Sequence, residues 1–424
     1  MCVVSRALLR PLLRPSSAPD SGAENLNRGF LLFEASDFVA FPAGGQLTMA
    51  RHIMHAFAGE VALVGVDTDG SAPIGSWKTR LIDGNAYPFF AVRHVSPTPI
   101  RPWIPARLST FAALNQYRDA ILGFGVRRAF CQGHETLLAI ARWQWDSLCY
   151  DFPGVASPLA ISRYPWARPL AMAFDASFFR ALRHVDAVLA TADPSAVEAM
   201  CKRSHGAVSP NQVTVWPTRV DTQTFRPGDR GMARQATGID VDKVVLVTTG
   251  RVNWVKGWPL LLDCLAQGDV AWQLVFVGDG EDRHALLARA RAMGLQDRVV
   301  VTGFRSPGEV ADYIRAADVF VMASFHEGFS TAMIEALACG VPIVSTDVSS
   351  ATTIVDNGVT GHVISGRDAG DYARAVRSAL AMPRDEVTEH SLRRVGDYAT
   401  ANIRRDLIRV WPDLQGGSQP KSTA

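Results

Sequence analysis

The chain has 424 residues, of which 48% are hydrophobic and 20% charged, and its formal net charge is +2. The length is sufficient for two or three domains with their own cores, and the near-neutral charge argues against nucleic acid as a partner. The sequence has no run of about 18 apolar residues, so no membrane-spanning helix is predicted. Its six scattered cysteines include no C-x-x-C pair and are typical of reduced thiols in a cytoplasmic protein.

The two ends of the chain are predicted to be disordered. In the leader, residues 1–27, prolines at positions 11, 15 and 19 interrupt a stretch rich in leucine and arginine. Because proline inside a helix is costly, an unstructured leader is favoured over a membrane-surface or targeting helix, which stays as the alternative. The tail, residues 413–424, ends in the polar sequence Gly-Gly-Ser-Gln-Pro-Lys-Ser-Thr-Ala.

Short apolar runs alternate with helical patterns along the rest of the chain. In the first half they predict strands at 30–34, 61–67, 128–132, 148–152 and 187–191, and in the second half at 244–249, 273–278, 299–302, 319–323 and 343–345. Continuous apolar runs are typical of parallel strands that are covered on both faces.

The two series of strands predict an α/β protein with two Rossmann-like, doubly wound domains, at 28–225 and 243–384. Between them, the polar segment 226–242 is rich in Gly and Arg and predicts a linker. Apolar residues on one face of 385–412 predict a C-terminal helix.

Polar and glycine residues follow the strands of the second domain. Arg251, Gly278–Gly280, Phe304 and Glu327 each come shortly after a predicted strand. Since ligands of doubly wound sheets bind beyond the carboxyl ends of the strands, we expect these residues to converge on one edge.

The most informative stretch runs from His326 to Gly340. It predicts a helix from about Ser330 to Cys339 that ends at Gly340. The N-terminus of a helix behind a glycine-containing turn suits phosphate. The carboxylates of Glu327 and Glu335 do not attract phosphate, so we expect them to accept hydrogen bonds from hydroxyls on either side of it. A nucleotide sugar has this layout.

Several motifs carry a resemblance to one family. Glu327 to Glu335 matches the E-x7-E signature of retaining glycosyltransferases of the GT-B fold, family 4, and Gly250–Gly257 resembles that family's G-R-x4-K-G segment. Further similar segments are Val275–Gly280, Val301–Phe304 and Val220–Phe225, the last with Arg219 where the family usually has glycine. The likeness covers about residues 213 to 365, and it implies two domains facing across a cleft, with the C-terminal helix returning to the first domain.

The resemblance implies roles for residues of the second domain. Arg251 and Lys256 would balance the charge of the leaving diphosphate, Glu327 would contact the donor sugar, and Glu335 would bind the ribose. The other residues implied in substrate binding are Gly278, Gly280, Phe304, Gly328, Phe329, Ser330 and Thr331.

The first domain resembles the family less closely. Gly44 and Gly45 fit the family's glycine-rich loop at the donor or acceptor, with a plain tight turn as the alternative. Relatives often place a histidine after a strand of this domain, and two residues compete for that role here. Either His134 serves, or Asp151 serves, or neither acts and both make only local hydrogen bonds; Pro153 departs from the D-x-[RH]-G pattern of many relatives.

Asp67-Thr68-Asp69 resembles the D-x-D metal motif of another glycosyltransferase fold. The following Gly70-Ser71 predicts a turn, where Asp is common for backbone reasons. We therefore expect no metal site, and the resemblance implies metal-independent chemistry without a cofactor.

The resemblance implies a retaining hexosyltransferase that uses a nucleoside-diphosphate sugar as co-substrate. The acceptor would be a hydroxyl of a glycan or lipid-linked glycan, in cell-envelope or extracellular glycan biosynthesis. The protein would work in the cytoplasm, with a peripheral contact at the inner membrane face allowed. The base stays open between UDP, GDP and ADP. The alternatives are a nucleotide-sugar epimerase or hydrolase of the same fold, and a non-catalytic nucleotide-sugar binding protein.

Overall fold

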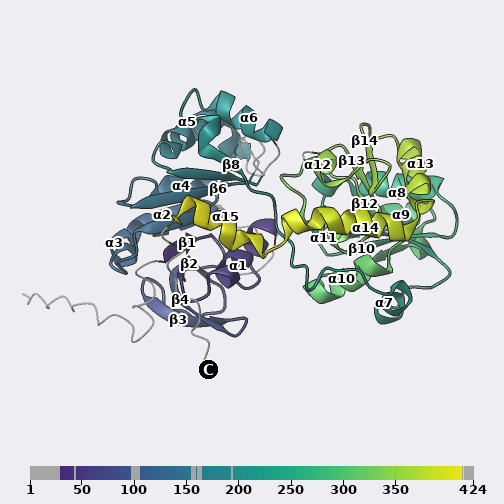
Figure 1. Cartoon of the computed structure of the whole chain (residues 1–424), viewed down its shortest axis with the longest axis horizontal. Helices are drawn as coiled ribbons and strands as arrows, with labels where there is room; N and C mark the ends of the chain where they lie inside the picture. Colours follow the sequence, from purple (N-terminus) through teal and green to yellow (C-terminus); the bar gives the residue numbers. More distant parts are fainter. Residues whose placement is uncertain are drawn as a thin grey trace, which may run out of the picture.

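A computed structural model describes residues 29–414, apart from 43, 97–105, 154–158, 160–164, 192–193, 349 and 413. The leader expected at 1–27 and nearly all of the expected tail lie outside the described residues. The described chain forms two α/β domains, one around each of two separate sheets, and the chain passes from one domain to the other (Figure 1). This confirms the predicted fold class of two doubly wound domains.

The first domain is built on an eight-stranded sheet with the order β3-β4-β2-β1-β5-β6-β7-β8. All neighbours are parallel except β3 and β4, which form an antiparallel hairpin. The strands are β1 (Phe30–Phe33), β2 (Val61–Asp67), β3 (Trp77–Ile82), β4 (Asn85–His94), β5 (Arg128–Gln132), β6 (Ser147–Phe152), β7 (Ala187–Ala190) and β8 (Val213–Val215).

Helices cover both faces of this sheet. One face packs against α2 (Ala106–Gln116), α3 (Arg118–Leu122), α4 (His134–Ile140), α5 (Ala171–Leu182) and α6 (Pro194–Arg203). The other face packs against α1 (Gly45–Ala56) and the last helix of the chain, α15 (Asn402–Val410). The order in which strands are added to the sheet reverses between β1 and β5, which are parallel, so the loops that follow these two strands meet at one edge.

The second domain is built on a six-stranded parallel sheet with the order β11-β10-β9-β12-β13-β14. The strands are β9 (Val244–Thr249), β10 (Trp272–Val277), β11 (Val299–Val301), β12 (Val319–Met322), β13 (Ile343–Thr346) and β14 (Gly361–Ile364). Its helices are α7 (Arg230–Thr237), α8 (Trp258–Gln267), α9 (Arg283–Ala292), α10 (Pro307–Ala316), α11 (Thr331–Ala338), α12 (Ala351–Ile354), α13 (Ala369–Leu380) and α14 (Arg384–Val395). Strand order reverses between β9 and β12, so the loops after these strands form the switch point of the sheet.

The chain passes between the domains twice. The first crossing leads from β8 toward α7, and the second leads from α14 in the second domain to α15 in the first (Figure 1). The segment in which the spacing predicts one C-terminal helix therefore contains two, with a short 3-10 turn at Gly396–Tyr398 between them. Ile403 and Leu407 of α15 are fully buried in the core beside α1, and Arg404 pairs with Glu60 at 2.9 Å. No helix in the described part of the chain has the length and apolarity needed to cross a bilayer.

Candidate active site

The loop after β9 is held against the end of β12 by a glycine. Gly257 has a φ of 69°, and a β-carbon added there would lie 1.7 Å from the Ala323 carbonyl oxygen. Only glycine fits such a close approach in this backbone conformation. The preceding turn is closed by Asn253, whose side chain accepts a hydrogen bond from the Lys256 amide. The loops of the switch point are therefore in contact, and Lys256 faces the loop after β12.

Lys256 and Glu327 form an ion pair across the switch point. The Lys256 Nζ lies 2.6 Å from the Glu327 Oε1, and the Ser324 hydroxyl donates to the same oxygen at 2.6 Å. Arg251 follows β9 on the same edge and is exposed, and no ion pair to it occurs within the described ranges. The site therefore has one cation held by a carboxylate and a second that faces solvent.

The segment after Glu327 begins α11. Ser330 caps this helix by accepting from the Met333 amide, and its own amide donates to the Ser350 hydroxyl at 3.1 Å. A β-carbon added at Gly328 would lie 2.8 Å from the Pro153 carbonyl oxygen of the first domain. The absence of a side chain at Gly328 thus allows the two domains to approach each other at the start of α11. Phe329, the residue after Gly328, is buried.

Glu335 lies one turn inside α11, beside buried apolar residues. Part of its surface still reaches solvent, but the protein around the carboxyl is dense, and this burial raises the pKa of Glu335 to about 8. In the described structure no side chain or amide donates a hydrogen bond to this carboxyl. A buried carboxyl in this state gains from a ligand that donates hydrogen bonds to it.

The glycines after β10 pack against the loop after β9. Added β-carbons would lie 2.0 Å from the Gly250 carbonyl oxygen at Gly278 and 2.2 Å from the Val252 carbonyl oxygen at Gly280. These close contacts bring the loops of β9 and β10 together. Phe304 follows β11 on the same edge, and its side chain is 70% exposed. The residues expected at the carboxyl edge of the second sheet do converge there.

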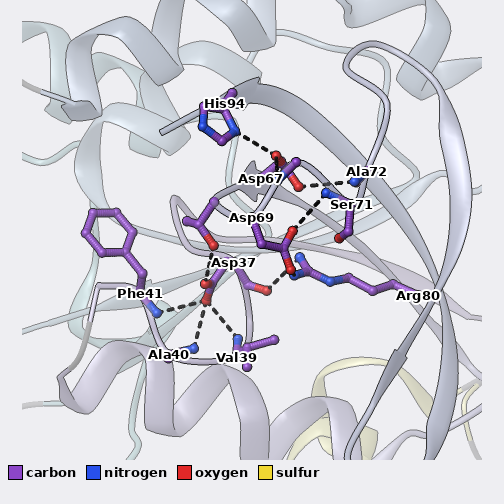
Figure 2. Close-up of polar contacts among 12 residues, drawn as sticks. Asp37, Val39, Ala40, Phe41, Asp67, Asp69, Ser71, Ala72, Arg80 and His94 are labelled. Carbon is purple, nitrogen blue, oxygen red and sulfur yellow. Dashed lines mark hydrogen bonds and ion pairs between the residues drawn. The ribbon is translucent and has the colours of Figure 1, made fainter. Parts of the chain in front are cut away.

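Gly44 and Gly45 of the first domain lie at the start of α1, opposite the start of α11. A β-carbon added at Gly45 would lie 3.5 Å from the Thr331 hydroxyl oxygen, so the glycine loop reaches the second domain. Sequence reasoning missed Asp37, which shapes this loop. Its Oδ1 accepts from three successive amides, those of Val39, Ala40 and Phe41 (Figure 2). An aspartate four residues after the end of β1 is the only signal in the sequence.

His134 and Asp151 are both buried in the first domain. His134 begins α4, is 1% exposed, and packs among aromatic rings, with the Phe178 ring centroid at 4.5 Å. Asp151 accepts from Gln132 at 2.9 Å and from the Thr191 hydroxyl at 2.7 Å. Burial raises the pKa of Asp151, and these hydrogen bonds act in the opposite direction.

Of these two residues, Asp151 is the one whose hydrogen-bond partner Thr191 approaches the second domain. Thr191 bonds Asp151 through its hydroxyl, and its carbonyl oxygen lies 3.4 Å from a β-carbon added at Gly328. His134 is buried, and its described ring contacts are with aromatic residues of its own domain. Thr191 was not singled out by sequence reasoning, because its contact with the second domain comes from folding alone.

The Asp67-Thr68-Asp69 segment forms a turn whose oxygens are already engaged (Figure 2). Asp67 accepts from the amides of Gly70 and Ala72 and pairs with the His94 Nδ1 at 2.7 Å. Asp69 accepts from the Ser71 amide and pairs with Arg80, and hydrogen bonds from Ser71 lower the pKa of Asp69 to about 2. The bonds from the Gly70, Ser71 and Ala72 amides are the backbone roles that the turn prediction assigns to the two aspartates. The described residues contain no group of three or more His, Cys, Asp or Glu arranged to hold a metal ion.

Comparison with known proteins gives a family match in the second half of the chain. Residues 229–400 match the family described as Glycosyl transferases group 1. One curated relative, D-inositol 3-phosphate glycosyltransferase 2 of Catenulispora acidiphila, is 33% identical over 240 residues, which are 52% of this chain and 55% of that protein. The chain thus spans about half the length of the curated relatives that it matches.

Solved structures are similar over nearly the whole chain. Sucrose-phosphate synthase from Thermosynechococcus elongatus has a TM-score of 0.77 at 20% identity, over 92% of this chain and 100% of that chain. Anabaena HepE in complex with UDP-glucose has a TM-score of 0.66 at 17% identity, over 91% of this chain and 99% of that chain. The fold of the chain is therefore GT-B, and its residues 229–400 match the group 1 glycosyl transferases.

Proposed function

We propose that this chain is a retaining glycosyltransferase of family 4, which moves a hexosyl group from a nucleoside-diphosphate sugar to a hydroxyl acceptor. One observation carries the proposal. The Lys256–Glu327 ion pair lies at the switch point of the second sheet, beside the capped start of α11, and Arg251 follows the same strand, β9, as Lys256. In this arrangement the cations and the helix N–H groups can bind a diphosphate. The carboxylates can bind the sugars on either side of that diphosphate.

The partly buried carboxyl of Glu335 supports the orientation of the donor. A ribose presents two neighbouring hydroxyls, and both can donate to this carboxyl, which has no donor in the described structure. Glu327 lies on the other side of the helix start, held by Ser324 and Lys256. We infer that the ribose lies toward Glu335 and the transferred sugar toward Glu327.

The proposed chemistry is the breaking of the bond between the anomeric carbon and the diphosphate oxygen. Negative charge then grows on the leaving diphosphate, and Arg251 and Lys256 are the groups that we assign to stabilise it. In a front-face attack, the acceptor oxygen forms the new bond and its proton passes to the departing phosphate oxygen. Neither a metal ion nor a cofactor has a step in this proposal.

We infer that the acceptor docks on the first domain, where Gly44 and Gly45 face the start of α11. Closure of the domains would exclude water and suppress hydrolysis of the donor. Acceptors to be tried are hydroxyls of glycans and lipid-linked glycans, as used in envelope glycan synthesis, and phosphorylated cyclitols, which the names of the relatives suggest. We propose that the reaction takes place in the cytoplasm, on free acceptors or at the inner membrane face.

A thermal-shift panel of sugar nucleotides tests the donor claim, because a ligand that binds the folded state raises its stability. We expect at least one of UDP-glucose, GDP-mannose and ADP-glucose to raise the melting temperature of the wild type. A wild type that no sugar nucleotide stabilises would contradict the proposal. Incubation of the stabilising donor alone then separates transfer from isomerisation, since an epimerised sugar formed without acceptor would favour an epimerase.

A further inference from the structure

Both passages of the chain between the domains meet at one buried place. The Val220 amide donates to the Tyr398 carbonyl at 2.8 Å, and the Thr400 amide donates to the Val220 carbonyl at 3.0 Å. Arg219 reinforces the junction, because its guanidinium donates to the Asp397 carbonyl and pairs with Asp406 at 2.6 Å. We call residues 216–220 and 397–402 the crossing.

The crossing holds the loop that begins α11. The Thr218 Oγ1 donates to the Phe329 carbonyl oxygen at 2.9 Å, across 111 positions of sequence, and the two residues are 4% and 8% exposed. The Phe329 ring also packs against the Tyr398 ring, with centroids 5.7 Å apart. Phe329 is thus held by both segments of the crossing. Residues 216–220 hold its carbonyl, and residues 397–402 contact its ring.

The fixed carbonyl lies within the short stretch that carries the candidate donor contacts. Glu327 is two residues before Phe329, Gly328 meets the first domain, and Ser330 caps α11. A shift of the Phe329 carbonyl therefore moves the helix start and the Glu327 backbone together. A hydroxyl that holds this carbonyl sets the position of all three.

We propose that Thr218 is a positioning residue of the donor site, which ties the Glu327–Ser330 loop to the crossing between the domains. The proposal rests on the proposed function, since it assumes that this loop contacts the sugar nucleotide. Thr218 does not touch the donor; its hydroxyl orients the loop that does. Movement of the crossing during domain closure reaches the donor loop through this hydrogen bond, so that closure and donor binding favour each other.

Thr218→Val and Thr218→Ser make a matched pair for the test. Valine keeps the β-branched shape and removes the hydroxyl, whereas serine keeps the hydroxyl. Calorimetry with UDP-glucose, GDP-mannose and ADP-glucose, and with each free diphosphate, measures affinity well below the melting temperature. We expect Thr218→Val to weaken binding of the sugar nucleotide roughly tenfold, as for a lost buried hydrogen bond. The free diphosphate, which does not reach Glu327, should lose less affinity, and Thr218→Ser should stay within about twofold of the wild type.

A double-mutant cycle with Glu327→Gln identifies the route of the effect. If Thr218 acts through the loop, its effect on sugar-nucleotide affinity shrinks when Glu327 is already substituted. A Thr218→Val protein that melts earlier but binds sugar nucleotides as tightly as the wild type would overturn the proposal and leave the donor site itself intact. A wild type that binds none of the three would overturn the proposed function and this inference together. Thr218→Ala, which also lacks the hydroxyl, replaces the valine variant if that protein does not fold.

Discussion

The ammonium of Lys256 lies 2.6 Å from the carboxylate of Glu327, and the two residues come from loops that follow different strands, β9 and β12. The side chains are 34% and 12% exposed, so the pair is shielded on the carboxylate side and open on the ammonium side. An entering diphosphate can therefore approach the ammonium without displacing Glu327. The carboxylate holds the ammonium in this orientation before the ligand arrives.

Lys256→Ala is expected to lose most of the stabilisation by a sugar nucleotide. Hydrogen bonds to charged groups contribute about 1.5–3 kcal/mol, so the affinity should fall about tenfold to hundredfold in calorimetric titration. Arg289→Ala is the matched control. Arg289 lies in the last turn of α9, and the substitution removes its half-exposed ion pair with Asp263. Equal donor affinity of the two variants would refute the role of Lys256.

Gly257→Ala should unfold far more easily than Gly294→Ala. Both glycines have φ near 70°, but an added β-carbon meets the Ala323 carbonyl oxygen only at Gly257 and finds open space at Gly294. The backbone term alone costs about 1–2 kcal/mol, and the clash adds to it, giving about 3–5 kcal/mol at Gly257. Urea unfolding followed by tryptophan fluorescence measures the difference, and similar losses in the two variants would show that the loops after β9 and β12 are not in this contact.

Glu335 predicts a dependence of stability on pH. Burial raises its pKa from 4.5 to about 8, so between these values the folded carboxyl is protonated and the unfolded one is ionised. Unfolding then releases a proton, and the free energy of unfolding falls as pH rises through this window, by at most about 1.4 kcal/mol per pH unit. The contribution is fully present below pH 4.5 and is lost above pH 8.

The variant Glu335→Gln isolates this contribution, because the amide does not titrate. Urea unfolding at several pH values between 5 and 8 should give a smaller downward slope for Glu335→Gln than for the wild type. Parallel slopes would mean that Glu335 titrates normally in the folded protein.

Sequence patterns predict the continuous apolar strands well, because β2, β5 and β9 are buried on both faces. They miss the hairpin of β3 and β4, since β3 carries the polar run Lys78–Arg80 at an edge of the sheet. They also miss β14, which is only four residues long. Length and periodicity carry little information for such strands.

The candidate site likewise contains residues that the sequence predicts and contacts that it does not predict. The glycines, the cations and Glu327 are readable because each follows a strand, and strand ends of a parallel sheet share one edge. The contacts between the domains are not readable. The bond from Thr218 to the Phe329 carbonyl joins residues 111 positions apart, and the approach of Gly328 to Pro153 depends on how the domains pack.

Glycosyl transfer is tested most directly by the release of nucleoside diphosphate from the stabilising sugar nucleotide, measured with and without acceptor and followed by mass spectrometry. The acceptor panel contains D-inositol 3-phosphate, hexose phosphates and lipid-linked glycans. We expect release that depends on one acceptor class, with a product heavier by one hexosyl unit. Donor conversion at the same rate without acceptor, or no glycosylated product from any of them, would contradict the proposed transfer.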